Sequence, residues 1–169
     1  MKSLLKILLP LAMAFIATSG FAQQKVGHIN ADAVIAAMPE REEAMKQLDA
    51  YQKEHEETYQ AIQKEFQDKN AVYEERRDTY TPAIREQREN ELTSLYQKLE
   101  EYPSVVQRGG QELWQKLMTP IQEKVMGAIE KVAKANSFAY VVNSMALMYS
   151  DDVQMVDLVP LVKKELGLQ

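Results

Sequence analysis

The chain has 169 residues and a formal net charge of −5, with 20 Lys or Arg against 25 Asp or Glu. This acidic balance disfavours nucleic acid and anionic lipid as main partners, because both bind through an excess of basic residues. The absence of cysteine excludes a disulfide scaffold, thiol chemistry and a lipoprotein anchored through a thiol. The length suits a single domain that must be stabilised by burial.

Residues 1–22 have the pattern of a cleavable secretory signal peptide. Two lysines accompany an apolar stretch over residues 4–16, and a small-x-small cleavage pattern ends at Ala22. The stretch contains a proline and is shorter than the roughly 20 apolar residues of a spanning helix. We therefore expect cleavage after Ala22 rather than an uncleaved anchor, and no stable membrane insertion of the mature domain, residues 23–169.

The mature domain begins with a short predicted strand over residues 26–30. Asn30 is a suitable N-cap for a turn of helix over residues 31–37. Pro39 ends that turn, because proline excludes the α conformation of the residue before it and lacks a backbone donor.

The next segment, residues 40–79, contains neither glycine nor proline. Its apolar and aromatic residues recur every three or four positions, which predicts a long helix packed against one partner helix. This outgoing seam consists of Met45, Leu48, His55, Tyr59, Ile62, Phe66 and Tyr73.

A turn is predicted at residues 79–82, where Pro82 suits the first position of a second helix. The return limb has its own seam, so residues 40–135 are expected to form a coiled-coil hairpin arm. Two interpretations of the prolines and glycines in the return limb stay open: a kinked helix that wraps a straight one, or a jointed arm. The seam consists of Ile84, Leu92, Leu95, Leu99, Tyr102, Val106, Leu113, Leu117, Ile121, Val125, Ala128, Val132 and Ala135.

The C-terminal part predicts two more strands and a helix. Residues 138–143 are rich in β-branched and aromatic side chains, and residues 147–149 form a shorter candidate strand. Asp157 is expected to cap a last helix that Gly167 closes. With residues 23–39, residues 136–169 therefore predict a small α+β base from which a long helical arm protrudes. The expected core and subunit contacts of the base are Val26, Ile29, Val141, Val142, Leu158, Leu161, Val162 and Leu166.

Groupings of catalytic residues are sparse. Neither His28 nor His55 has a partner at metal-ligand spacing, and no nucleophile elbow or phosphate-binding glycine run is present. We therefore expect no enzyme activity, no cofactor and no metal. The arm is rich in aromatic residues, which either lie along neighbouring side-chain stems or contact another chain. The candidate contact residues are Tyr51, Tyr73, Tyr80, Tyr96 and Met118.

The chain resembles the Skp/OmpH family of periplasmic chaperones. The resemblance rests on residues 25–30, the long charged hairpin, residues 132–143, Tyr149 and the closing helix over 157–167. It implies a homotrimer with a shared β core, whose three arms enclose a cavity that holds unfolded outer-membrane β-barrel proteins without ATP. The best-known members are strongly basic, so this acidic chain is not expected to share contacts with lipopolysaccharide or anionic membranes.

A structural coiled-coil spacer or envelope scaffold is the alternative function. A spacer would favour an uninterrupted heptad pattern in both limbs. The prolines and glycines of the return limb favour the holdase instead.

Overall fold

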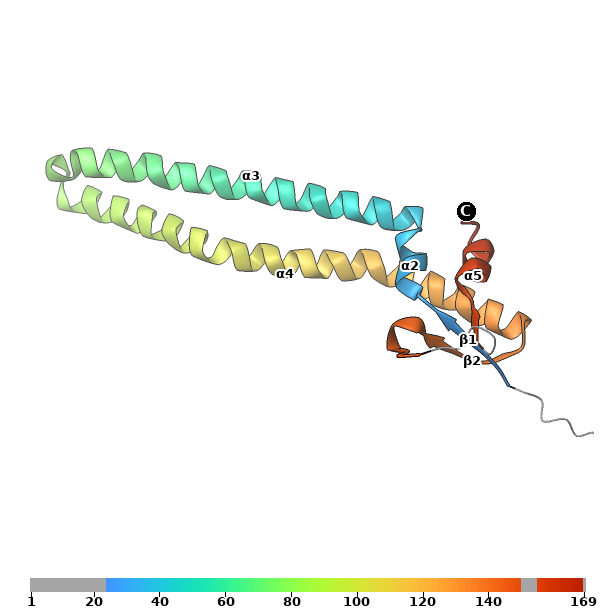
Figure 1. Ribbon diagram of the computed structural model, residues 1–169. Helices are drawn as coiled ribbons and strands as arrows, with labels where there is room; N and C mark the ends of the chain where they lie inside the picture. Colours follow the sequence, from blue (N-terminus) through green and yellow to red (C-terminus); the bar gives the residue numbers. More distant parts are fainter. Residues whose placement is uncertain (1–23, 150–154, 169) are drawn as a thin grey trace, which may run out of the picture. The chain divides into compact units, whose positions relative to one another are not determined.

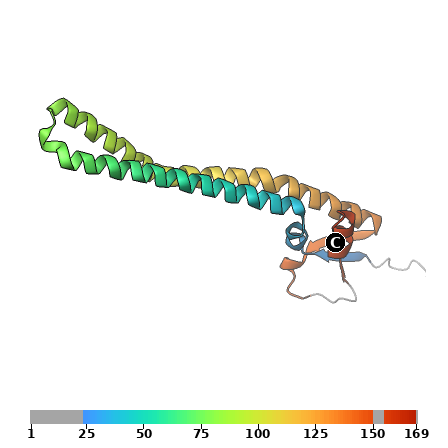
Figure 2. The same ribbon diagram turned by 90° about the horizontal axis from the view of Figure 1, so that it is seen from above.

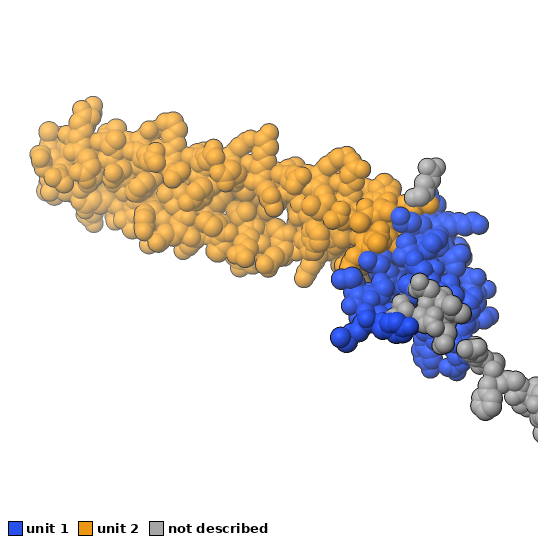
Figure 3. Space-filling model, in the orientation of Figure 1, with its two compact units in different colours: residues 1–31, 128–167, 169 blue, residues 32–127, 168 orange. Residues whose placement is uncertain are grey.

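The protein is described here by a computed structural model that covers residues 24–149 and 155–168 (Figure 1). The chain forms two compact units (Figure 3). One unit, the base, comprises the described residues of 1–31 and 128–167, and the other, the arm, comprises residues 32–127. The division falls inside the return helix, whereas the sequence places it at the end of that helix. The predicted signal peptide lies outside the described residues.

The base contains a parallel sheet of three strands in the order β2-β1-β3. The strands are β1 (Lys25–Ile29), β2 (Phe138–Asn143) and β3 (Met155–Asp157). Val26 lies opposite Tyr140 on one side and Met155 on the other. The sequence predicts that the two ends of the mature domain form one base, and the pairing of β1 with β2 confirms this.

The prediction of a strand at residues 147–149 is wrong. After β2 the chain enters a 3₁₀ turn, η2 (Ser144–Ala146), in which the Asn143 side chain accepts a hydrogen bond from the Met145 backbone N–H at 2.9 Å. This local bond competes with continued strand pairing. The third strand is β3, which the sequence did not reveal because it has only three residues.

Helix α5 (Val159–Glu165) follows β3 directly. The Asp157 carboxylate accepts a hydrogen bond from the Val159 backbone N–H at 2.9 Å, and Gly167 adopts a left-handed conformation with φ of 71° after the helix. Gly167 therefore closes the helix as predicted. The N-cap position is occupied by Leu158 and not by Asp157 as predicted, and Asp157 accepts its hydrogen bond one residue before the cap. Leu158 and Val162 are fully buried in the base, together with Ile29, Ala128, Ile129 and Val132.

The arm consists of short helix α2 (Ala31–Ala36), then α3 (Pro39–Arg76), the 3₁₀ turn η1 (Arg77–Thr79) and α4 (Pro82–Ala135), whose last residues belong to the base. The two long helices run antiparallel as a hairpin (Figure 1 and Figure 2). At the tip, the Thr81 hydroxyl accepts a hydrogen bond from the Ile84 backbone N–H. Helix α4 continues through its internal prolines, Pro103 and Pro120.

The arm has a thin core. Only Ala44, Leu48 and Ile62 of α3 are buried, and no residue from 63 to 117 is buried. A thin core follows from a two-helix hairpin, because each helix packs against one partner and leaves the rest of its surface in solvent. None of the helices in the described part of the chain combines the length and apolar character needed to cross a bilayer.

The absence of a side chain at Gly27 lets strand β1 pack closely against Leu158 and Phe138. A Cβ atom at Gly27 would lie 2.2 Å from Leu158 Cδ1 and 3.1 Å from the Phe138 ring. Leu158 is fully buried, so it has no free space to move into. We predict that Gly27→Ala lowers the free energy of unfolding by about 1–3 kcal/mol, as overpacking does. Urea unfolding measures this change.

Gly127→Ala is the matched control for that substitution. A Cβ at Gly127 meets nothing within 4 Å, and alanine favours a helix over glycine by roughly 0.8–1 kcal/mol. The control should be neutral or stabilising. A Gly27→Ala variant as stable as the wild type would contradict the packing described for the base.

Candidate functional site: the seam and surface of the arm

Tyr51 docks into a notch of α4 that two glycines create. Its hydroxyl donates a hydrogen bond to the Val106 carbonyl at 3.1 Å. A Cβ at Gly109 would lie 2.3 Å from Tyr51 Oη, and one at Gly110 would lie 3.6 Å from Tyr51 Cε1. The glycine pair, interpreted from the sequence as an interruption of the limb, therefore makes room for a tyrosine that the sequence places off the seam.

A group of aromatic side chains continues the seam beside this notch. His55 Nδ1 and the Tyr102 hydroxyl are 2.7 Å apart, and the rings of Tyr51 and His55 meet edge to face with centroids 4.2 Å apart. Tyr59 stacks on Tyr102 at 6.3 Å. Aromatic rings of this kind supply apolar area while their polar atoms find partners, so a half-exposed seam can tolerate them.

The described residues contain no cluster of metal ligands. No group of three or more His, Cys, Asp or Glu side chains is placed to hold a metal ion within residues 24–149 and 155–168. His55 pairs with Tyr102 instead. The expectation of no metal and no cofactor stays a prediction.

Two hollows lie along one side of the seam. A hollow of about 860 Å³ is lined by His55, Tyr59, Tyr102 and Pro103 among others, and one of about 560 Å³ extends to Met45 and Trp114. They share the lining residues Asp49, Gln52, Val106 and Gln107. Together they form a groove lined by aromatic side chains, such as Tyr102 and Trp114, and by polar ones, such as Asp49 and Gln52. We use the term "seam groove" for it.

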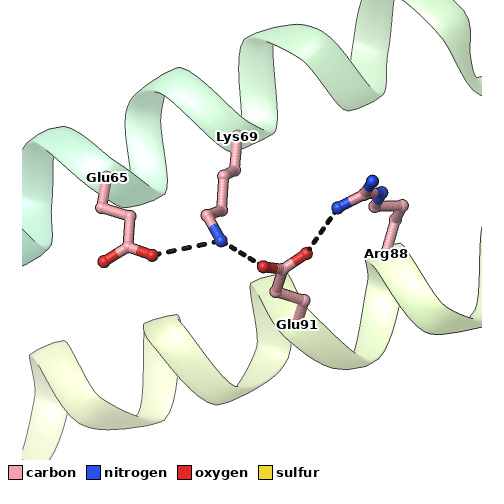
Figure 4. Close-up of polar contacts among 4 residues, drawn as sticks. All are labelled: Glu65, Lys69, Arg88 and Glu91. Carbon is pink, nitrogen blue, oxygen red and sulfur yellow. Dashed lines mark hydrogen bonds and ion pairs between the residues drawn. The ribbon is translucent and has the colours of Figure 1, made fainter.

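Nearer the tip, charged residues link the two limbs (Figure 4). Lys69 of α3 pairs with Glu91 of α4 and, at 3.1 Å, with Glu65, while Arg88 donates to Glu91 at 2.9 Å. The hydrogen bonds from Lys69 and then Arg88 hold the pKa of Glu91 below its ordinary value of 4.5. Lys69 thus links the two limbs across the seam.

The predicted contact tyrosines lie in different environments. Tyr51 is half-buried in the notch described above, and Tyr73 donates a hydrogen bond to Glu89, which raises the pKa of the Tyr73 phenol. Tyr80 lies 6.3 Å from Tyr73 between ring centroids. Tyr96 is 52% exposed and is therefore the most accessible of the four to another chain.

Met118, also predicted as a contact residue, requires a correction. It is only 5% exposed, and Ile121 and Val125 of the same helix are buried as well. The sequence could not show this, because Met118 stands one position from the predicted seam residue Leu117. Accessible apolar side chains missing from the predicted set are Val72, Ile84, Val105, Trp114 and Met126.

The predicted core of the base is only partly buried. Ile29, Leu158 and Val162 are buried, Leu161 is exposed, and the other four predicted residues (Val26, Val141, Val142 and Leu166) are half-buried. Exposed apolar residues gather on edge strand β2 and in the segment after it. They are Tyr140, Met145, Met148 and Tyr149.

Comparison with known proteins identifies the family. The model of the outer membrane protein family (OmpH-like) matches residues 25–166. The chain belongs to this OmpH-like family. A crystal structure of a Caulobacter crescentus CB15 protein, described as a candidate outer membrane chaperone (OmpH-like), has the same fold, with a TM-score of 0.73. The two chains share 13% identity over 88% of this chain and 87% of that chain. No curated protein matches the chain.

The notch predicts an unequal response of this OmpH-like protein to alanine at two adjacent glycines. Gly109→Ala should destabilise by about 1–3 kcal/mol, because its Cβ displaces the Tyr51 hydroxyl from the Val106 carbonyl. Gly110→Ala is the control and should be neutral or stabilising, since its Cβ makes an ordinary contact. Thermal unfolding followed by far-UV circular dichroism compares them. Tyr51→Phe should reduce the cost of Gly109→Ala, and equal costs in both backgrounds would contradict the docking.

The Lys69–Glu91 link predicts a pH-dependent contribution to stability. A carboxyl whose pKa is lower in the folded state stabilises the fold above its unfolded pKa, and this contribution is lost as the pH falls through the folded pKa. Glu91→Gln should therefore lower stability slightly at neutral pH, and the difference from wild type should vanish below the lowered pKa of Glu91. Urea unfolding at several pH values measures it.

Glu86→Gln is the control for this titration. Glu86 lies on the same helix and its carboxylate has no ion pair within the described part of the chain. A stability difference for Glu91→Gln that persists unchanged in acid would show that the link acts through packing and not through charge.

Proposed function

We propose that the protein is an ATP-independent holdase of the periplasm that binds unfolded outer membrane proteins in a cavity between the arms of a homotrimer. The observation that carries the proposal is the thin arm: no residue from 63 to 117 is buried, and Tyr96 and Trp114 stay exposed within it. Scattered apolar side chains on a polar surface allow many weak contacts without irreversible burial of a client. The family and the chaperone description of the C. crescentus relative support it.

The trimer is supported by the open surface of the base. A small sheet with one short helix is only marginally stable alone. Tyr140, Met145 and Tyr149 are exposed on and after edge strand β2, and symmetric association would cover such a patch. The secretory pattern of residues 1–22 supports the periplasmic location.

Removal of most of the arm tests the division of roles. Replacement of residues 45–125 by a short flexible linker should preserve the trimer in sedimentation equilibrium, because the apolar patch belongs to the base. The same variant should fail to keep an unfolded barrel protein soluble at a molar ratio at which the full-length protein succeeds. An armless protein that still prevents aggregation would favour the spacer function for the arm, and a monomeric full-length protein would contradict the cage.

Client capture is predicted to depend only weakly on salt. The arm carries more acidic than basic residues, and exposed ion pairs contribute at most about 1 kcal/mol. The affinity for an unfolded barrel protein, measured at low and high ionic strength, should therefore change less than tenfold. A larger loss in high salt would indicate capture led by charge.

A further inference from the structure

We propose that the seam groove binds an extended polypeptide segment of about five to six residues through a row of glutamine side chains on α4. The row is Gln107, Gln111 and Gln115, which line the groove at intervals of four residues. The bound segment would belong to an unfolded client, so this site rests on the holdase function proposed above. It adds a defined subsite to that function.

The dimensions of the groove suit an extended chain. Its α4 side runs from Tyr102 at one end to Gln115 at the other, which at 1.5 Å per helical residue is roughly 20 Å. A strand rises about 3.3 Å per residue, so about five to six residues fill this length. Tyr51, Val106 and Gly110 also line the groove.

The glutamine repeat matches the repeat of a strand. Four helical residues advance about 6 Å, and two residues of an extended chain advance about 6.6 Å. A strand presents the backbone N–H and C=O of every second residue along one edge. Each glutamine amide offers both donors and an acceptor, so Gln107, Gln111 and Gln115 can pair with alternate residues of one edge. A helical ligand would not present its backbone groups in this way.

The pairing groups in the groove are available. Within the described residues, the side chains of Asp49, Gln52 and the three glutamines of the row make no hydrogen bond or ion pair with the rest of the chain. Asp49 lines both hollows, near the middle of the groove. Of the other charged lining residues, Glu56 adds a second carboxylate and Lys53 lies 4.0 Å from Glu57. The net acidic lining favours a basic side chain at the centre of the segment and disfavours acidic ones. The occupant is therefore an extended segment with one central Lys or Arg and no other charged residue.

A labelled peptide tests the row directly. The probe is a capped peptide whose five-residue core alternates threonine and valine around a central lysine, and fluorescence anisotropy measures its Kd for the full-length mature protein. The triple variant Q107A/Q111A/Q115A should weaken binding at least tenfold, while alanine keeps the helix intact. The matched control Q87A/Q97A/Q122A changes three exposed glutamines of α4 outside the groove and should stay within twofold. Equal effects of the two variants would overturn the site.

Two further experiments do not depend on the triple variant. N-methylation of alternate residues of the core removes the donors of one edge, so one methylated series should lose binding at least tenfold and the other should keep it. Asp49→Lys should weaken the lysine peptide and favour a peptide with glutamate at the centre. Equal losses for both methylated series, or no change of charge preference, would contradict an oriented strand beside Asp49.

Suppression of aggregation of an unfolded barrel protein is measured in parallel with the wild type. A wild type that keeps the barrel protein soluble, but whose peptide binding ignores the glutamine row, overturns the groove and leaves the holdase function standing. A wild type that fails to keep the barrel protein soluble contradicts the proposed function itself.

Discussion

The parallel pairing of β1 with β2 is the constraint on which the rest of the structure depends. The two strands begin at Lys25 and Phe138 and run in the same direction, so the chain between them must leave the end of β1 and return to the start of β2. Here two long antiparallel helices make that connection. Each helix of such a hairpin has a single partner, and this accounts for the thin core of the arm and its large exposed surface.

Side chains in a thin seam are only partly buried, and their polar atoms need hydrogen-bond partners there. Tyr51, His55 and Tyr102 meet this need, because their rings pack while their polar atoms reach a carbonyl or one another. The same side chains line the seam groove, beside polar ones such as Asp49 and Gln52. The features that stabilise the arm as a two-helix layer thus also leave apolar surface accessible, and this combination suits weak and reversible contact with another chain.

Helical periodicity in the sequence predicts the hairpin well, because Leu48, Ile62 and Val125 recur at the spacing of a buried seam and are buried. Short strands are harder: β3 has three residues and gains its stability from pairing with β1, which no local pattern records. The glycines of α4 were also ambiguous. A glycine that weakens a helix and one that admits Tyr51 look alike until the partner helix is in place.

The central claim is that the surface of the arm, and not the base, contacts an unfolded client. Photo-crosslinking tests this most directly, with a photoreactive residue placed in the full-length protein at Tyr96 or Trp114 of the arm, or at Lys164 of the base, all of which are exposed and lie outside the apolar patch proposed to join the subunits. An unfolded barrel protein should crosslink at Tyr96 and Trp114 and much less at Lys164. Crosslinks confined to Lys164 would contradict the account.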